Sequence, residues 1–405
     1  MALRGFNQLK EDTSQPSSDT KPGVWTRKIS FRLCSSIANG LNLASKKFLL
    51  IVAALYSGAL VTVGGIYWYT KHTLEKVQPV PDDWTFKQKL LGLAGANHHE
   101  EERYGIVLKY YEELVNELVL NEDGSVKDID KKSPAWLAGY ADIVLRLGLS
   151  QEKMGHREDA RQALESGCSI PYGQKSLKAK GELQLGLYEK EIGNHRQAEK
   201  LIRKSIGYLL SKDQITDTSG SVIVNKTTLL TDEQVTPLME LAKLYVAQKR
   251  LKEALNLFLS IQRGIKEHAR SLGDSKHLAD PKCLEPTVMS YVSEILWALN
   301  NKRDAIIWAE GSYHEANNKS RGRIECGLCA QMAANNVSKM YKHFKMTDQS
   351  EQFKKLSENQ YIAPINSRKK EPFWTKHWLA GTVLLKKNQN IAPAGLQFAE
   401  NSLLG

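Results

Sequence analysis

One pattern of residues occurs twice in this 405-residue chain, and it constrains the fold more than any other feature. Residues 147–164 read LGLSQEKMGHREDARQAL, and residues 185–202 read LGLYEKEIGNHRQAEKLI. In each stretch a Leu-Gly pair lies 13 and 12 residues before an alanine, which is Ala160 or Ala198, and a lone glycine lies five residues before it. Small residues repeated at fixed spacing indicate a repeated structural unit that packs against its own copies.

Weaker copies of the pattern follow further along the chain. LAKLYVAQKRLKEALNLFLSI aligns on Ala254, YVSEILWALNNKRDAIIWAEGS aligns on Ala305, and NVSKMYKHFKMTDQSEQFKKL aligns weakly on Ser350. The spacing L-G-x2-Y followed by A-x3-F resembles the tetratricopeptide repeat, in which small residues stand where two antiparallel helices cross and large residues fill the gap to the next helix. We therefore expect an all-α fold, a tetratricopeptide-repeat α-solenoid of five or six helix pairs over residues 82–357.

The copies are spaced more widely than the usual repeat. The first two lie 38 residues apart, the third follows after 56 residues and the fourth after 51, against roughly 34 in a standard tetratricopeptide repeat. The extra length falls in residues 211–231 and 263–286, which are rich in turn-forming residues. We expect loops there, the first with a short β-like run. An earlier pair begins near Asp82, and Ser133 with Pro134 predicts the start of the next.

Residues 48–69 form a run of 22 residues without a charge, FLLIVAALYSGALVTVGGIYWY. A helix of this length spans about 33 Å, which is enough to cross the hydrocarbon core of a bilayer. Two lysines precede the run and three aromatic residues end it, as at many membrane boundaries. The run predicts one N-terminal transmembrane helix. Ala54, Gly58 and Gly65 lie near one face of it and are candidates for helix packing in the membrane.

Residues 1–47 are basic, with eight Lys or Arg against three acidic residues. The positive-inside rule therefore places this side in the cytosol or the mitochondrial matrix. Residues 27–47 contain no acidic residue, and apolar side chains recur there every four positions, as in a mitochondrial presequence. The segment is otherwise expected to be largely disordered. We predict a mitochondrial inner-membrane protein with its N-terminus in the matrix and its C-terminal body in the intermembrane space. A plain basic flank of a membrane span remains the alternative.

The net charge of +11 does not indicate nucleic-acid binding. Five of these charges belong to residues 1–47, and the remaining six are spread over residues 71–405. No block of Lys or Arg is long enough to form a phosphate-binding stripe. We expect no nucleic-acid partner.

No stretch of the sequence matches an established catalytic motif, and we expect neither enzymatic activity, a cofactor, a small-molecule substrate nor a metal. Cys326-Gly-Leu-Cys329 has redox spacing, but its flanks predict a continuous helix without the preceding strand of a redox domain, so we interpret the pair as core packing. An enzyme using this pair is the less favoured hypothesis. NHHEEER at 97–103 is not a zinc motif and is interpreted as a solvated helix start. Five cysteines in so long a chain imply no disulfide framework.

The first helices of a tetratricopeptide solenoid line its concave face, where peptides or domains bind. Counting from the repeat positions predicts a protein-binding groove with apolar residues and charges of both signs. Its candidate residues are Asp142, Leu149, Glu152, Lys180, Leu187, Lys190, Lys243, Val246, Glu294 and Trp297. Because the asparagine position of chaperone-tail clamps holds Leu149, Leu187, Lys243 and Glu294, we expect unfolded or extended segments instead.

A basic presequence-like segment, one membrane span and degenerate tetratricopeptide repeats occur in this order. The arrangement resembles a fungal mitochondrial inner-membrane family of adaptors for the i-AAA protease. The resemblance implies a solenoid in the intermembrane space that binds unfolded substrates and presents them to this membrane protease, as part of protein quality control. The alternatives are an outer-membrane import receptor and a general assembly scaffold of a mitochondrial membrane complex. Residues 358–405 are expected to form a C-terminal cap or tail, with a capping, membrane-surface or partner-docking helix at 371–386.

Overall fold

The computed structural model describes residues 43–74, 79–121, 125, 127–218, 220–272, 283–320, 323–360 and 362. The chain divides into two compact units, residues 1–79 and residues 80–405, and each is described by itself. The predicted presequence-like helix at 27–47 falls largely outside the described residues, and the predicted helix at 371–386 falls entirely outside them.

The described residues of the first unit include one long helix, α2 (Leu43–Leu74). Most of its described large apolar side chains are exposed, from 55% at Leu49 to 75% at Val61, and Val52 is half-buried. No other part of the described structure lies within 4 Å of a Cβ built at Gly58 or Gly65, so helix packing there stays a prediction. Among the described residues, no helix is both long enough and apolar enough to cross a membrane.

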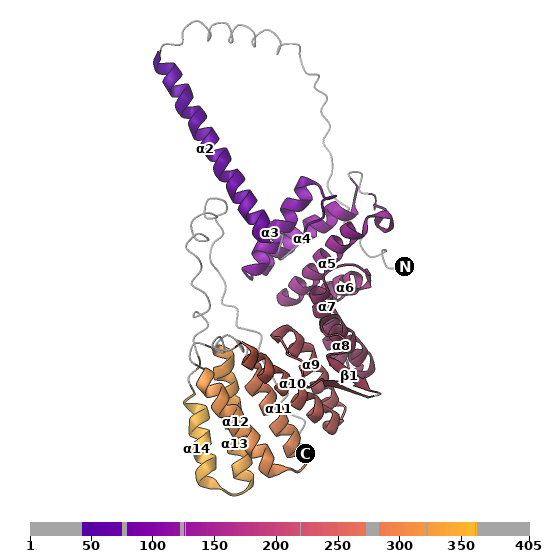
Figure 1. Cartoon of the computed structure of the whole chain (residues 1–405), viewed down its shortest axis with the longest axis vertical. Coiled ribbons are helices and arrows are strands. Elements are labelled where there is room, and N and C mark those ends of the chain that lie inside the picture. The colour runs from indigo at the N-terminus through magenta and orange to yellow at the C-terminus, as the bar shows by residue number, and fades with distance from the viewer. Residues whose placement is uncertain are drawn as a thin grey trace, which may run out of the picture. The chain divides into compact units, whose positions relative to one another are not determined.

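The second unit is a stack of antiparallel helix pairs, drawn from magenta to yellow in Figure 1. Six pairs follow one another in the described residues, and neighbouring pairs contact each other along the chain. The pairs are α3 (Phe86–Glu100) with α4 (Tyr104–Val119), α5 (Pro134–Met154) with α6 (Arg157–Ser169), α7 (Lys175–Glu191) with α8 (His195–Leu209), α9 (Asp232–Ala247) with α10 (Leu251–Ser271), α11 (Leu284–Ala298) with α12 (Lys302–Lys319), and α13 (Ile324–His343) with α14 (Thr347–Glu358). The predicted all-α, tetratricopeptide-type α-solenoid is confirmed.

All six helix pairs have a left-handed residue at the same position of the turn that joins their two helices, so the pairs can be aligned with one another. Gly155 and Gly193, the lone glycines of the repeated stretches, adopt a φ of 83°, in the left-handed region where glycine is favoured. Residues without that freedom adopt the same conformation at the corresponding place in the other four pairs. These residues are Glu102, Lys249, Asn300 and Lys345, with φ between 58° and 64°.

Small residues occupy the helix crossings, as the pattern predicts. Each left-handed residue lies seven positions after a glycine, alanine or serine of the first helix. A Cβ built at Gly186 would lie 2.8 Å from Cγ1 of Ile202 on the second helix, and one at Gly148 would lie 2.9 Å from Cγ of Leu164. The six small residues are Gly95, Gly148, Gly186, Ala242, Ser293 and Ser338.

Local signals fix where several helices begin. The Ser133 side chain accepts a hydrogen bond from the backbone N–H of Trp136, and Pro134 occupies the first turn of α5, as predicted. Thr231 and Gln234 form a capping box at the start of α9. A short 3-10 helix, η1 (Ile129–Lys131), precedes α5.

The insertion between α8 and α9 forms a two-stranded hairpin, as the β-like run there suggested. Strand β1 (Ile215–Thr218) pairs antiparallel with β2 (Ser221–Val224). Val222 and Val224 are buried, and the Val224 carbonyl accepts a hydrogen bond from Arg263 Nη2 of α10 at 3.0 Å. The inserted hairpin thereby joins the core of the fourth pair.

The structure corrects two interpretations of the sequence. Cys326 does not serve as simple core packing, because it forms a disulfide with Cys283 across a separation of 43 residues. The segment 97–103 is not a helix start. His98 and His99 lie in the last turn of α3, and the His98 ring is buried and stacks on Tyr110 with centroids 5.6 Å apart.

Candidate protein-binding surface

The first helices of successive pairs form a continuous surface, which we call the inner face. Helix α5 contacts α7, α9 contacts α11, and α11 contacts α13, and ion pairs connect α7 to α9. The inner face therefore runs without interruption across five parallel helices. All ten candidate groove residues lie on the first four of these.

At the N-terminal end of the inner face, two of the three predicted residues are committed to internal contacts. Asp142 is only 3% exposed, and its Oδ1 accepts a hydrogen bond from the backbone N–H of Gln174 at 2.8 Å. Burial raises the pKa of the Asp142 carboxyl. The Glu152 carboxylate accepts a hydrogen bond from the Tyr188 hydroxyl. Leu149 remains half-buried and available for an apolar contact.

At the centre of the inner face, lysine and glutamate side chains of α7 and α9 form a series of ion pairs. Glu240 accepts from Lys190 at 3.2 Å and from Lys243 at 2.7 Å. Burial acts to raise the pKa of Glu240, but the two ammonium groups outweigh it and the net pKa is lowered. Lys180 pairs with Glu233 at 3.2 Å. A bound segment therefore meets ion-paired groups here, with one ammonium in excess of the carboxylates, flanked by half-buried Leu187 and Val246.

Towards the C-terminal end, Glu294 differs from the other inner-face charges. Its carboxylate accepts a hydrogen bond from Asn336 Nδ2 of α13 at 3.1 Å. Within the described structure its carboxylate has no ion-pair partner. The residue as a whole is exposed, while its carboxyl group is partly desolvated by the surrounding protein. Burial of the carboxylate among its neighbours raises its pKa. Tyr291, one turn earlier, lies beneath the Lys243 ammonium, 5.2 Å from its ring centroid. Glu294 is thus an uncompensated negative charge on a largely neutral surface.

Trp297 anchors an aromatic cluster where α11 and α13 end. Its ring makes edge contacts with His343 and Phe344, with centroids 5.2 and 6.0 Å apart. The Lys302 ammonium lies 5.3 Å from the Trp297 centroid, and Phe344 remains 42% exposed. The cluster gives this end of the inner face an apolar rim.

Sequence reasoning missed the residues that connect one helix to the next, namely Glu240, Tyr291 and Asn336. They occupy the same repeat position, three residues before Lys243, Glu294 and Lys339. Their partners lie on neighbouring repeats, so pairing them requires the angle between adjacent pairs, which the pattern within one repeat does not contain.

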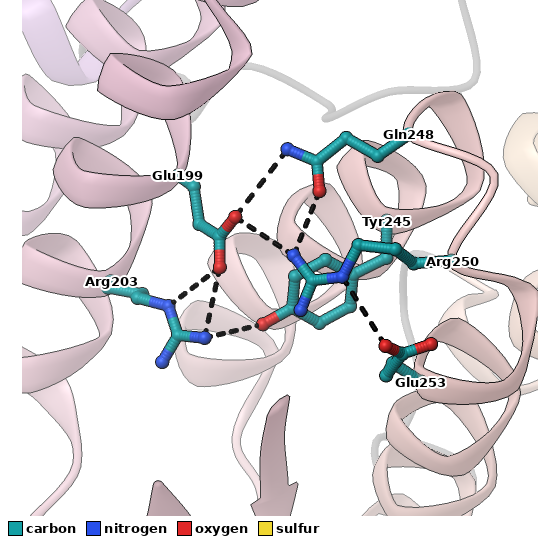
Figure 2. Close-up of polar contacts among 6 residues, drawn as sticks. All are labelled: Glu199, Arg203, Tyr245, Gln248, Arg250 and Glu253. Carbon is teal, nitrogen blue, oxygen red and sulfur yellow. Dashed lines mark hydrogen bonds and ion pairs between the residues drawn. The ribbon is translucent and has the colours of Figure 1, made fainter. Parts of the chain in front are cut away.

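A second polar cluster joins the third pair to the fourth, away from the inner face. Figure 2 shows Glu199 of α8 at the centre of this cluster. Its carboxylate forms ion pairs with Arg203 on the same helix and with Arg250, which lies in the turn between α9 and α10. The Arg203 Nη2 donates to the Tyr245 hydroxyl at 2.9 Å, and the Arg250 guanidinium lies 4.0 Å from the centroid of the Tyr245 ring. The members of the cluster are Glu199, Arg203, Tyr245, Gln248, Arg250 and Glu253.

Equivalent contacts occur at two other junctions between pairs. Arg161 of α6 pairs with Glu189 of α7 at 2.8 Å, and the Tyr341 hydroxyl of α13 donates to Glu310 of α12 at 2.6 Å. Each contact joins a second helix to the end of the next first helix. We interpret these contacts, like the cluster in Figure 2, as structural connections that set the angle between neighbouring pairs and so shape the inner face.

The described residues contain no group of three or more His, Cys, Asp or Glu side chains arranged to hold a metal ion. The polar groups of the inner face are hydrogen-bonded or ion-paired as recognition groups are. This arrangement suits noncovalent binding of a polypeptide.

No family model matches the sequence, and no curated protein matches it. Solved structures of similar fold include kinesin light chain TPR-like repeats from Podosopora anserina, with 13% identity over 59% of this chain and 99% of that chain, at a TM-score of 0.40. BtubC from P. vanneervenii has 10% identity over 70% of this chain and 99% of that chain, at a TM-score of 0.45. A Rap protein bound to Competence and Sporulation Factor has 10% identity over 70% of this chain and 68% of that chain, at a TM-score of 0.40.

Proposed function

We propose that this chain is a membrane-anchored adaptor of mitochondrial protein quality control. Its inner face binds unfolded or extended protein segments, and its anchor brings them to an AAA protease of the inner membrane. The observation that supports the binding role is the inner face itself. It is a continuous surface of five parallel helices on which half-buried apolar residues alternate with ion-paired side chains. Such a surface accepts varied sequences, because it offers few strong and specific charges.

The membrane anchor and the compartment rest on the sequence. None of the described helices qualifies as a span, so the support is the 22 uncharged residues 48–69 with basic residues before them and aromatic residues at their end. The exposed apolar side chains of α2 agree with this role, since they require a cover. The Cys283–Cys326 disulfide adds support for a body outside the reducing cytosol and matrix.

Binding is tested with the full-length chain in detergent and a permanently unfolded probe, reduced and carboxymethylated α-lactalbumin carrying a fluorophore. We expect L187D/V246D to weaken binding at least fivefold, because both substitutions place a charge among the apolar contacts of the inner face. I307D is the matched control, since Ile307 of α12 is 65% exposed and lies outside the inner face. Equal binding by both variants, with unchanged melting temperatures, would exclude the inner face as the binding surface.

Compartment and partner are tested in mitochondria that express the tagged chain. We expect protease added to intact mitochondria to leave the body intact, and to degrade it once the outer membrane is ruptured. Degradation in intact mitochondria would instead support the import-receptor alternative. Gentle solubilisation should co-isolate a membrane AAA protease, and its reproducible absence would remove the adaptor role while leaving the binding role standing.

A further inference from the structure

The disulfide between Cys283 and Cys326 is inaccessible in the folded chain. Both residues are 0% exposed. Cys283 caps the start of α11, and Cys326 is the third residue of α13, so the bond ties the first helices of the last two pairs together. A disulfide donor in solution cannot reach either sulfur of this pair directly once the helices have packed.

A third cysteine lies beside the pair and, unlike them, keeps some solvent exposure. Cys329 is half-buried and lies one turn beyond Cys326 on α13, so the two side chains share one side of the helix. The Thr287 hydroxyl of α11 donates to the Cys283 carbonyl at 2.7 Å and lies 3.7 Å from Cys329 Sγ. The Thr287 side chain therefore contacts the Cys329 sulfur and the Cys283 backbone carbonyl, which places Cys329 beside the residues that form the disulfide.

We propose that Cys329 is the site at which an external disulfide donor modifies this chain, and that it passes the oxidation inward to Cys283 and Cys326. The inference is independent of the proposed adaptor function. It assigns a role to each part of the Cys-Gly-Leu-Cys sequence, with Cys329 as the accessible thiol and Cys326 as the residue that resolves the mixed disulfide.

Three exchanges make up the relay. The Cys329 thiolate attacks a donor disulfide RSSR, forming Cys329–S–S–R and releasing one RS⁻. The Cys326 thiolate then attacks Cys329 Sγ, forming a Cys326–Cys329 disulfide and releasing the second RS⁻. Finally the Cys283 thiolate attacks Cys326 Sγ, forming the observed bond and returning Cys329 as a thiol. The net change oxidises two thiols to one disulfide, and their two protons leave on two RSH.

The position of Cys326 favours the second exchange. It lies in the first turn of α13, where unsatisfied backbone N–H groups stabilise a thiolate. The spacing of three residues brings Cys326 and Cys329 onto adjacent positions of one helix face. The N-terminal turn of the helix thus opposes the effect of burial on the resolving thiol.

The test follows disulfide formation in the full-length protein carrying C34S, since Cys34 lies outside the described residues. The chain is reduced, freed of reductant and exposed to glutathione disulfide, and each cysteine is then mapped by alkylation and mass spectrometry. We expect C329S to form the Cys283–Cys326 bond at least tenfold more slowly than the parent while reaching the same end state. C168S should match the parent, because Cys168 is buried and burial raises its thiol pKa to about 12.

Two further arms keep the outcome independent of how well C329S folds. In C326S the resolving thiol is absent, so glutathione should accumulate on Cys329. In guanidinium chloride the burial is lost, so C329S and the parent should be oxidised at equal rates. The relay would be disproved if folded C329S formed the bond at the parent rate, or if glutathione in C326S accumulated on Cys283.

Discussion

Single residues at the helix crossings show what the sequence could predict. The small positions follow from the repeated Leu-Gly spacing, and the structure places Gly148 and Gly186 against second helices, as expected. Gly95 lies in the earlier pair predicted to begin near Asp82, but its crossing position was not assigned from the sequence; a buried tyrosine stands where the next three copies have leucine, isoleucine or phenylalanine. The partner at the crossing, Tyr111, is supplied by α4 and fills the space that a side chain at Gly95 would need.

Substituting the glycine at this crossing tests the close approach. A Cβ at Gly95 would overlap the ring of Tyr111, which is fully buried. We expect Gly95→Ala to lower the free energy of unfolding by about 1–3 kcal/mol, as overpacking does. Gly207→Ala is the control, because Gly207 also lies in a helix but a Cβ there meets nothing within 4 Å. The control should gain up to about 1 kcal/mol. Urea unfolding measures both, and a neutral Gly95→Ala would contradict the packing.

The carboxylate of Glu294 should make stability depend on pH. Its pKa is raised from the ordinary value of 4.5 by burial, so the folded chain binds this proton more tightly than the unfolded chain does. Stability is then lost as pH rises from the ordinary value through the raised one. Glu294→Gln should therefore stabilise the chain above that window, by less than about 1 kcal/mol because solvent screens the group, and have little effect at lower pH. The exposed Glu351→Gln serves as control. The measurement is the melting temperature of both variants from pH 4 to 8. The same pH dependence in Glu294→Gln and Glu351→Gln would refute the prediction.

At the scale of elements, the helix pairs could be predicted but their turns only in part. The lone glycines marked two of six turns. Three of the other four use residues that normally avoid the left-handed region, such as Lys249 and Lys345, so no sequence signal identified them. Asn300, at the fourth, is of a type that adopts this conformation more readily. Their conformation is imposed by the packing of the flanking helices. The disulfide was unpredictable for a related reason, because the distance between α11 and α13 depends on how two pairs stack.

The strained turns offer a way to stabilise the solenoid. Lys249 adopts a φ of 62°, which costs a residue with a side chain about 1–2 kcal/mol relative to glycine. After the greater flexibility of glycine in the unfolded chain is subtracted, we expect Lys249→Gly to gain about 0.5–1 kcal/mol. Lys252→Gly, in the following helix, should instead lose about 1 kcal/mol. Urea unfolding compares the free energies of unfolding of the two variants. A larger loss in Lys249→Gly than in Lys252→Gly would contradict backbone strain at Lys249.

For the whole molecule, the apolar core is divided along the stack. The buried apolar residues of the described structure include four clusters: two within α3 to α7, one that runs from α8 through α11, and one formed by α12, α13 and α14. Each cluster contacts mainly its neighbours, so stability should be distributed along the chain as in other repeat proteins. The sequence predicted the stack but not this division, because the long insertions between copies hide how far each core extends.

Reduction of the disulfide should therefore weaken one end of the solenoid selectively. Closing a loop across 43 residues contributes up to about 4 kcal/mol in the chain-entropy view, and both cysteines belong to the last two pairs. We expect reductant to increase hydrogen exchange in α11 to α14 while α3 to α7 keep their protection, because their two core clusters contain no residue of the cross-linked helices. A C283A/C326A variant should show the same profile without reductant and no further change with it. Uniform loss of protection along all six pairs would instead mean that the solenoid unfolds as one cooperative unit.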